Sequence, residues 1–336
     1  MAGNPGRPER MDAGLMQNRP PSPLVSVIIV NYNGKDLLPA CLSSLSKQTF
    51  SDFEIIVVDN GSADGSDSLP ESPGLRVLKL KKNTGFAHAC NRGAEAARGK
   101  WLAMLNTDAF PEPGWLASLL HAAKKYPEYD FFTSHQILRD HPDLLDGTGD
   151  MLAVNGRAWR RDRFLPLAEG TNRDDEVFGA CAAACLYRAD SFGRAGGFDE
   201  DFFCYYEDVD LSLRLRLMGY RCMHVCSAIV YHISSATSGG EESDFFLYHV
   251  CRNLTWTYIK SMPGKLLRKY ILSHLRLHYD IALYLMQQRR RKLLVKIWGG
   301  IGKGLPRVLA KRKKVQREST VCVAEPEHIM LSCKEQ

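Results

Sequence analysis

Several features that define common protein classes are missing from this sequence. No run of 18 apolar residues occurs in its 336 residues, so a membrane-spanning helix is not expected. No G-x-G-x-x-G follows the first predicted strand, no G-x-x-x-x-G-K-[ST] follows any strand, and no G-x-S-x-G occurs. These absences argue against a dinucleotide-binding fold, a P-loop protein and a serine hydrolase.

The ten cysteines are scattered and form no recognisable framework. The closest pairs are Cys181 with Cys185 and Cys222 with Cys226, and neither has the C-x-x-C spacing of a zinc or redox motif. His224 lies within the second pair and suggests a metal site, but its neighbours predict a buried strand. We therefore interpret the cysteines as buried thiols, which are typical of a reducing, cytosolic compartment.

Charge is distributed unevenly along the chain. The formal net charge is +6, yet residues 260–317 contain seventeen Lys or Arg and a single acid, Asp280. Such asymmetry predicts a basic segment that binds an anionic partner. Residues 1–23 are rich in Pro, Gly, Arg and Asn without an apolar core, which predicts a disordered leader and no secretory signal.

Predicted buried strands and helices alternate over the first part of the chain. Apolar, β-branched runs such as Val25–Val30 are typical of strands buried on both faces. The alternation predicts an α/β fold with a largely parallel sheet. Four predicted strands end in polar clusters, at Asn31–Asn33, Asp59–Ser62, Asn83–Gly85 and Asn106–Asp108. Because the carboxyl ends of parallel strands share one edge, the clusters predict a ligand site at that edge.

Three positions suit a hard divalent cation. Asp108 follows an apolar strand, and Asn106 points the same way if the backbone stays extended. His232 ends a predicted last strand pair, within residues 220–232, and would be aimed at the same edge. Mg²⁺ or Mn²⁺ commonly bridges a carboxylate to phosphate oxygens. The alternatives are an aspartate that caps the next segment and a histidine buried in the core.

The stretch Tyr205–Tyr220 reads YYEDVDLSLRLRLMGY and predicts a helix with an acidic start. Apolar residues recur every four positions from Val209, and Gly219 is a typical helix end. Glu207 and Asp208 would lie in the first turn, where the helix dipole favours an ionised carboxylate. Such a carboxylate at a crevice can accept a proton from an incoming hydroxyl, although acids at this position often do no more than cap the helix.

Together these stretches resemble glycosyltransferase family 2, which has the GT-A fold and an inverting mechanism, and in particular its rhamnosyltransferase-like branch. The resemblance covers residues 24–238 and rests on VSVIIVNYNG, QTFSDFEIIVVDNGSADGS, NTGFAHACNRG, WLAMLNTDA, GGFDEDFFCYYEDVDLSLRLRLMGY and VYHISSAT, in the family's order. It implies a Rossmann-like, mostly parallel sheet flanked by helices. It also implies an enzyme that transfers a sugar from a nucleotide-diphosphate sugar with the help of Mg²⁺ or Mn²⁺.

The resemblance implies roles for individual positions. Asp208 matches the family's catalytic base, with Glu207 assisting it, while Asp108 and His232 match its metal ligands. Asn106 occupies the first position of the family's D-x-D motif, a departure that lowers the charge of the ligand set. A nucleotide-sugar-binding role is implied for Asn31, Tyr32, Asp59, Asn60, Asn83, Gly85, Asn91 and Asn106.

The remaining segments are assigned to the acceptor and to a C-terminal extension. We expect a nucleotide-sugar-binding part at 24–112, an acceptor and catalytic part at 113–258, a basic amphipathic helical extension at 259–317 and a tail at 318–336. The polar, Gly-rich residues 140–178 predict a long excursion over the site. In this excursion Trp159 would stack on a sugar, and Arg160, with Arg161 and Arg163, would meet a phosphate. A solvated basic loop is the alternative.

The basic extension predicts binding to an anionic membrane surface, because basic amphipathic helices lie on such surfaces. This places the protein in the cytoplasm, peripheral on the cytoplasmic face of the membrane, beside a glycan or polyprenyl-linked acceptor. A helical hairpin packed on the domain is one alternative. Lys/Arg runs also bind phosphate backbones, but the apolar faces favour the membrane, and no nucleic acid partner is expected. The predicted function is sugar transfer, with rhamnose as a candidate, in cell-surface polysaccharide synthesis. A non-catalytic module of the same fold and a nucleotidyltransferase are the other possibilities.

Overall fold

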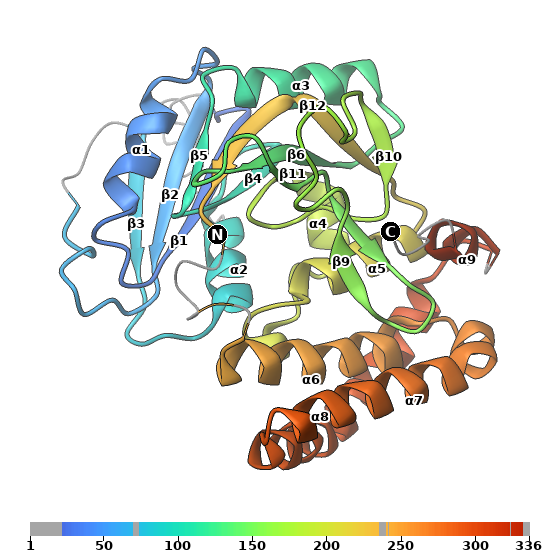
Figure 1. The fold of residues 1–336 in the computed structure, drawn as a ribbon. Coiled ribbons are helices and arrows are strands. Elements are labelled where there is room, and N and C mark those ends of the chain that lie inside the picture. The colour runs from blue at the N-terminus through green and yellow to red at the C-terminus, as the bar shows by residue number, and fades with distance from the viewer. Residues whose placement is uncertain (1–21, 70–73, 235–239, 241, 323, 332–336) are drawn as a thin grey trace, which may run out of the picture.

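The computed structural model describes residues 22–69, 74–234, 240, 242–322 and 324–331. Within these ranges, ten strands form one large sheet and two more form a separate hairpin, and helices cover both faces of the large sheet (Figure 1). Nearly all of the predicted leader, residues 1–21, lies outside the described residues, as do positions 323 and 332–336 of the predicted tail.

The large sheet combines a parallel half with a mixed half. Its strands are β1 (Val25–Asn31), β2 (Phe53–Asp59), β3 (Leu75–Lys79), β4 (Trp101–Asn106), β5 (Ala109–Pro111), β6 (Phe131–Leu138), β7 (Leu145–Gly147), β10 (Asp175–Val177), β11 (Ala184–Arg188) and β12 (Cys222–His232). Their order is β10-β12-β6-β11-β4-β1-β2-β3, with β5 paired to β12 and β7 to β6. Strands β1 to β4 pair in parallel, as predicted, and β12 is parallel to β6. Strand β11 lies antiparallel between β4 and β6.

The helices follow the strands in the order that the alternation predicts. They are α1 (Leu38–Ser46), α2 (Phe86–Ala96), α3 (Trp115–Lys125), α4 (Ala189–Arg194), the 3₁₀ turn η1 (Glu200–Phe202), α5 (Glu207–Leu217), α6 (Asp244–Ser261), α7 (Gly264–Gln287), α8 (Arg291–Glu318) and α9 (Ala324–Leu331). Successive residues of a strand point to opposite faces, so β1 contributes side chains to two hydrophobic cores. Val27 and Ile29 pack with α1 and α3 on one face, and Ile28 packs with α2 and α5 on the other.

Parallel register brings the polar strand ends together, as expected. Asn31 lies opposite Asp59 across β1 and β2, and Val30 lies opposite Asn106 across β1 and β4. Side chains from three separate segments therefore meet at the carboxyl edge of the sheet.

The predicted last strand pair is wrong. Residues 222–232 form the single strand β12, with an irregular register between Val225 and Ile229 where its pairing to β6 shifts. The strand continues through this irregularity, which accommodates the residues in the middle of the run that the sequence pattern took for a break. His224 is buried in β12 with its Nδ1 atom 3.2 Å from the carbonyl oxygen of Arg173, as expected for a core histidine rather than a metal ligand.

The excursion at residues 140–178 is more ordered than its composition suggests. It contains β7 and β10 of the large sheet and a hairpin of β8 (Asp150–Leu152) and β9 (Ala158–Arg160). The hairpin lies against α5, and residues 145–150 are buried. Several of its polar side chains therefore face the protein interior rather than solvent.

Helix α5 is buried on almost every side. Leu211 and Leu215 belong to the core shared with the sheet, whereas Val209, Leu213 and Leu217 pack with residues of the C-terminal helices. The sequence predicts a single apolar stripe here, and the structure instead sandwiches the helix between two layers.

A buried ionic network fixes α5 to the C-terminal helices. Asp210 accepts hydrogen bonds from Arg214, the predicted i,i+4 partner, and from Lys260 of α6, each at 2.8 Å. Lys260 also pairs with Asp199, which Lys311 of α8 contacts in turn. The boundary expected at residue 258 falls within α6, and the helices that follow it pack on the domain as the helical-hairpin alternative proposed.

Candidate active site

One cavity of about 600 Å³ opens at the carboxyl edge of the sheet. The strand ends form one wall, and the start of α5 and the β8–β9 hairpin form the other. Most of the residues proposed from the sequence line it: Tyr32, Asn60, Asn83, Gly85, Asn106, Asp108, Trp159, Arg160, Glu207, Asp208 and His232. The acidic start of α5 and the polar strand ends therefore face a common space.

Three of the proposed nucleotide-sugar residues support this cavity from behind. The Asn31 amide donates to Asp59 at 2.9 Å and to Ser66 at 2.9 Å, which fixes the turn after β2. Asn91 binds the backbone of Phe198 through both ends of its amide, at 2.9 and 3.0 Å. Asn31, Asp59 and Asn91 lie outside the cavity lining, so a direct contact with the donor stays a prediction for these three residues.

Asn60 organises the floor of the cavity. Its amide nitrogen donates to Asn83 at 3.1 Å and to the Gly85 carbonyl at 3.2 Å, and its oxygen accepts from the Thr84 backbone at 2.9 Å. Gly85 has a φ of +90°, and an added Cβ would lie 2.5 Å from the carbonyl oxygen of Phe203. Only glycine fits there without moving the loop that precedes α5.

Asp108 and His232 form the polar end of the cavity. Their side chains are buried, with His232 Nε2 3.2 Å from Asp108 Oδ1. The other ring nitrogen, Nδ1, lies 2.7 Å from Asp146 Oδ2. Burial opposes ionisation of Asp108, but its interaction with His232 outweighs burial and lowers the pKa of the carboxyl. Burial alone would lower the pKa of His232, and its two carboxylate neighbours raise it instead.

The atoms at this end suit a divalent cation. Asn106 Oδ1 is buried without a hydrogen-bond partner among the described residues, and it lies beside Asp108 and His232, whose Oδ1 and Nε2 atoms contact each other at 3.2 Å. Amide oxygen, imidazole nitrogen and carboxylate oxygen are ligands that Mn²⁺ accepts. The Asp146 carboxylate would orient the ring of His232, as outer carboxylates do for metal-ligating histidines.

The start of α5 carries two carboxylates with different surroundings. Asp208 is half-buried and accepts backbone hydrogen bonds from Ala182 at 3.1 Å and Val209 at 2.9 Å. Burial raises the pKa of Asp208, and these hydrogen bonds oppose the rise. Glu207 is buried, and desolvation together with the charge of Asp208 raises its pKa well above the usual range. Asp208 is therefore the better candidate for an ionised, accessible base.

The loop before α5 is held in an unusual conformation. Phe203, Tyr205 and Tyr206 all have positive φ angles, of 69°, 66° and 68°, which residues other than glycine rarely adopt. Such strain persists only where the surroundings enforce it. Helix α6 supplies the restraint, since the buried Asn253 amide donates to the carbonyl oxygens of Phe202, Cys204 and Tyr205 at 3.1, 2.9 and 2.7 Å.

The proposed acceptor residues come from the hairpin and the turn after it. Trp159 and Arg160 line the cavity, and the Arg160 guanidinium is paired with the buried Asp146. Arg163 also lines the cavity and donates to Ser234 at 3.2 Å. Arg161 lies outside the lining and is bonded to Thr148 at 2.9 Å. The solvated-loop alternative does not describe this segment.

Four residues of the site were not identified from the sequence. Asp146, Asp150 and Cys181 lie around the cavity beside the predicted residues, and Asn253 fixes the loop before α5. The stretch DGTGD, residues 146–150, carried the only local signal, since two acids flank a pair of glycines. Nothing local marks Asn253, which reaches the site only through the packing of α6.

The fold and this cavity together define a class, the GT-A glycosyltransferases. The chain aligns with GalNAc-T7 bound to UDP, GalNAc and Mn²⁺ with a TM-score of 0.58 and 16% identity, over 73% of this chain and 49% of that one. It aligns with the mannosyltransferase PcManGT of Pyrobaculum calidifontis, in complex with GDP-Man and Mn²⁺, with a TM-score of 0.55 and 17% identity, over 94% and 88% of the two chains.

Sequence comparison identifies the family within that class. Residues 26–194 match glycosyl transferase family 2, and the chain belongs to this family. It is 28% identical over 301 residues to the N-acetylglucosaminyl-diphospho-decaprenol L-rhamnosyltransferase of Mycobacterium tuberculosis, covering 80% of this chain and 97% of that protein. It is also 37% identical over 186 residues to a PGL/p-HBAD biosynthesis glycosyltransferase of Mycobacterium bovis, covering 53% and 64%.

The structure bears on two further expectations, the absence of a membrane-spanning helix and the presence of buried thiols. None of the described helices is both long enough and apolar enough to cross a bilayer. The nine cysteines in the described part are all free thiols, and six of them are buried.

Proposed function

We propose that this chain is an inverting, metal-assisted glycosyltransferase that uses a nucleotide-diphosphate sugar and a lipid-linked saccharide acceptor, with L-rhamnose as the leading candidate sugar. The observation that carries this proposal is the position of Asp208 on the same cavity as Asp108, His232 and the Asn60 cradle. The relative from Mycobacterium tuberculosis, whose name specifies both the sugar and a diphospho-decaprenol acceptor, supports the choice of substrates.

The transfer is a single displacement in which each residue has a limited task. Asp208 takes the proton from an acceptor hydroxyl while that oxygen forms a bond to the anomeric carbon. The bond between the anomeric carbon and the diphosphate oxygen breaks, and the diphosphate leaves with the electron pair. Asn60 and the Asn83–Gly85 turn hold the nucleotide end.

The polar end of the cavity serves the leaving group. Asp108, Asn106 and His232 would hold the cation, which when bound supplies positive charge to the departing diphosphate. Asp146 keeps the His232 ring in place through the 2.7 Å contact to Nδ1.

A donor and acceptor screen tests the function directly. We expect one nucleotide-diphosphate sugar to raise the melting temperature of the protein by several degrees in Mn²⁺ and by much less in chelator. A ligand at 100 times its Kd stabilises the folded protein by about 2.7 kcal/mol. That sugar should then be transferred to a polyprenyl-diphosphate N-acetylglucosamine. Binding without transfer to any lipid-linked acceptor would instead favour a non-catalytic module, and the absence of any binding would contradict both.

The outer surface of the C-terminal helices suits an anionic membrane. Along α7, Arg268, Leu272, Leu275 and Tyr279 recur at spacings of four and three residues and form one exposed stripe. Leu272 is 77% exposed, and Leu275 and Tyr279 are each 55% exposed. Helix α8 adds the exposed side chains Val295, Lys296, Trp298 and Lys303. An apolar stripe flanked by cations is the pattern of a helix that lies on a charged bilayer.

We expect the protein to bind phosphatidylglycerol vesicles at low salt and to bind phosphatidylcholine vesicles weakly. The double variant Leu272→Glu/Leu275→Glu should lose most of this binding, about 100-fold or more, because each leucine contributes about 1.5–3 kcal/mol when buried. Vesicle flotation measures the change.

The single variant Lys124→Glu is a matched control for charge. It lowers the net charge by two, as the leucine double variant does. The substitution lies on α3, at the opposite end of the molecule from α7 (Figure 1). Equal binding by the wild type and the leucine double variant would show that this stripe does not face the membrane.

A further inference from the structure

Asp150 is a buried carboxyl group with an unusual position. It opens the β8–β9 hairpin, and two backbone hydrogen bonds to Gly179, at 2.9 and 3.0 Å, fix its main chain. The residue is 5% exposed, and its Oδ2 atom has no hydrogen-bond partner in the described part of the chain. Leaving such an atom unpaired costs about 1–3 kcal/mol, so a ligand that satisfies it is expected.

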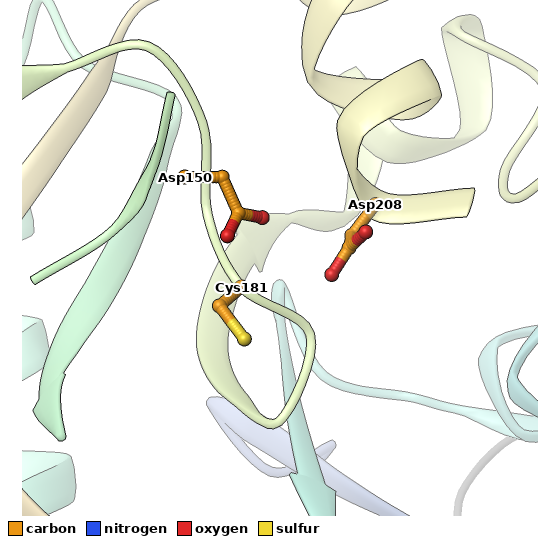
Figure 2. A group of neighbouring side chains, drawn as sticks. All are labelled: Asp150, Cys181 and Asp208. Carbon is orange, nitrogen blue, oxygen red and sulfur yellow. The ribbon is translucent and has the colours of Figure 1, made fainter. Parts of the chain in front are cut away.

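The unpaired carboxyl group faces the proposed base. Single atoms of Asp150, Cys181 and Asp208 lie within 4.8 Å of one another, and all three residues line the cavity. Figure 2 shows the Asp150 side chain projecting from one side toward Asp208 at the start of α5, with Cys181 below them. The acceptor hydroxyl that Asp208 deprotonates must therefore pass close to Asp150.

A metal ion is the weaker explanation for this trio. Metal binding needs the thiolate form of cysteine, and burial raises the pKa of the Cys181 thiol to about 12. A cation here would also occupy the Asp208 carboxylate and remove the base. The Asn106 amide oxygen and His232 Nε2, together with the Asp108 carboxylate, offer a cation a more suitable set of ligands.

The two carboxyl groups have different surroundings. Burial and the neighbouring charge of Asp208 raise the pKa of Asp150 well above the usual range, while backbone hydrogen bonds oppose the rise at Asp208. Asp150 is therefore the carboxyl group of the pair that more readily holds a proton. A neutral carboxyl group can both donate and accept a hydrogen bond, as a hydroxyl of a sugar requires.

We propose that Asp150 binds the acceptor saccharide through a hydroxyl that neighbours the nucleophile, and so selects which hydroxyl is glycosylated. The nucleophile itself is the less suitable partner, because a hydrogen bond donated to it would withdraw electron density from the attacking oxygen. The ligand class is a sugar with adjacent hydroxyl groups. This assignment rests on the proposed function.

The test is a cycle that combines enzyme variants with deoxy acceptors. Asp150→Ala should raise the acceptor KM about 10- to 100-fold while the donor KM stays within about twofold. For the wild type, one deoxy acceptor should have a KM that is raised by a similar factor over that of the complete acceptor. For Asp150→Ala, that same acceptor should cause little further loss, because the two changes remove one interaction. Additive losses for every deoxy acceptor would overturn the assignment.

Two controls separate this role from others. Asp150→Asn keeps the shape and a hydrogen-bond donor, so it should retain acceptor binding better than alanine and serves as the test variant if alanine does not fold. A melting temperature of Asp150→Ala well below that of the wild type, with acceptor KM unchanged, would show a structural role. Zn²⁺ binding that disappears in both Asp150→Ala and Cys181→Ala would show a metal site instead.

The wild-type reaction separates a failure of the proposed function from a failure of the Asp150 assignment. If the wild type transfers no sugar to any acceptor, the proposed function fails and this assignment fails with it. If the wild type transfers sugar and Asp150→Ala has an unchanged acceptor KM, only the assignment of Asp150 fails.

Discussion

Replacing Asp208 with asparagine is expected to lower kcat by about 10²- to 10⁴-fold while leaving donor binding nearly intact. The amide has the size of the carboxyl group but cannot accept the proton of the acceptor hydroxyl. Ala182 and Val209 donate to different oxygens of the Asp208 carboxylate, so the single amide oxygen of asparagine can keep one of these two backbone contacts. Initial rates at saturating donor and acceptor, together with the donor-induced shift in melting temperature, measure the two effects separately.

Glu207→Gln is the matched comparison for this variant. Glu207 is the adjacent carboxyl, but burial raises its pKa well above the usual range and so disfavours the ionised form that a base needs; its loss should affect the rate far less. A near-normal rate for Asp208→Asn together with a large loss for Glu207→Gln would move the base to position 207.

The second large effect is expected at the polar end of the cavity. Asp108→Asn should lower kcat by about 10³-fold and greatly raise the Mn²⁺ concentration needed for half-maximal activity. Asp108 provides the carboxylate charge of a ligand set whose other members are an amide and an imidazole, and cation stabilisation of a leaving diphosphate contributes several kcal/mol. Metal titrations of the initial rate measure both quantities.

Asn106→Asp is the complementary variant. It adds a carboxylate at the first position of the motif, where Asn106 Oδ1 is buried without a partner in the described structure. We expect tighter Mn²⁺ binding with activity retained. An enzyme whose rate is the same in chelator and in Mn²⁺, and unaffected by Asp108→Asn, would show that these residues do not serve a metal.

The parallel half of the sheet could be predicted because its signals are local. Buried strands such as Val25–Asn31 are apolar apart from Ser26 until they end in polar residues, which the parallel register then aligns. The acidic start of α5 was also visible, since Glu207 and Asp208 stand directly before a helical repeat. Periodicity and strand-end composition therefore located both walls of the cavity.

The supporting residues could not be predicted because their roles depend on contacts between distant segments. Asp146 matters through its contact with His232, 86 residues away, and Asn253 through three carbonyl oxygens about 50 residues before it. Asn91 sits in a family motif, yet the fold directs its amide to Phe198 rather than to the cavity. Local pattern gives no information on which way such an amide turns.

The basic C-terminal segment shows a similar limit. Its spacing predicts amphipathic helices but not whether the apolar residues face the domain or solvent. The structure divides them: Leu266 and Val308 are buried against the core around α5, while Leu272 and Trp298 are exposed. The same segment thus packs on the domain through one face and offers another to a partner.

The most direct test of the account is a crystal structure of the Asp208→Asn variant with Mn²⁺ and the nucleotide-diphosphate sugar identified in the screen. We predict the ion bound by Asp108 and His232 against the diphosphate, and the anomeric carbon facing residue 208 with space between them for an acceptor hydroxyl. A donor bound in the reverse direction, with its diphosphate against residue 208 or its sugar beyond reach of that side chain, would contradict the proposed reaction.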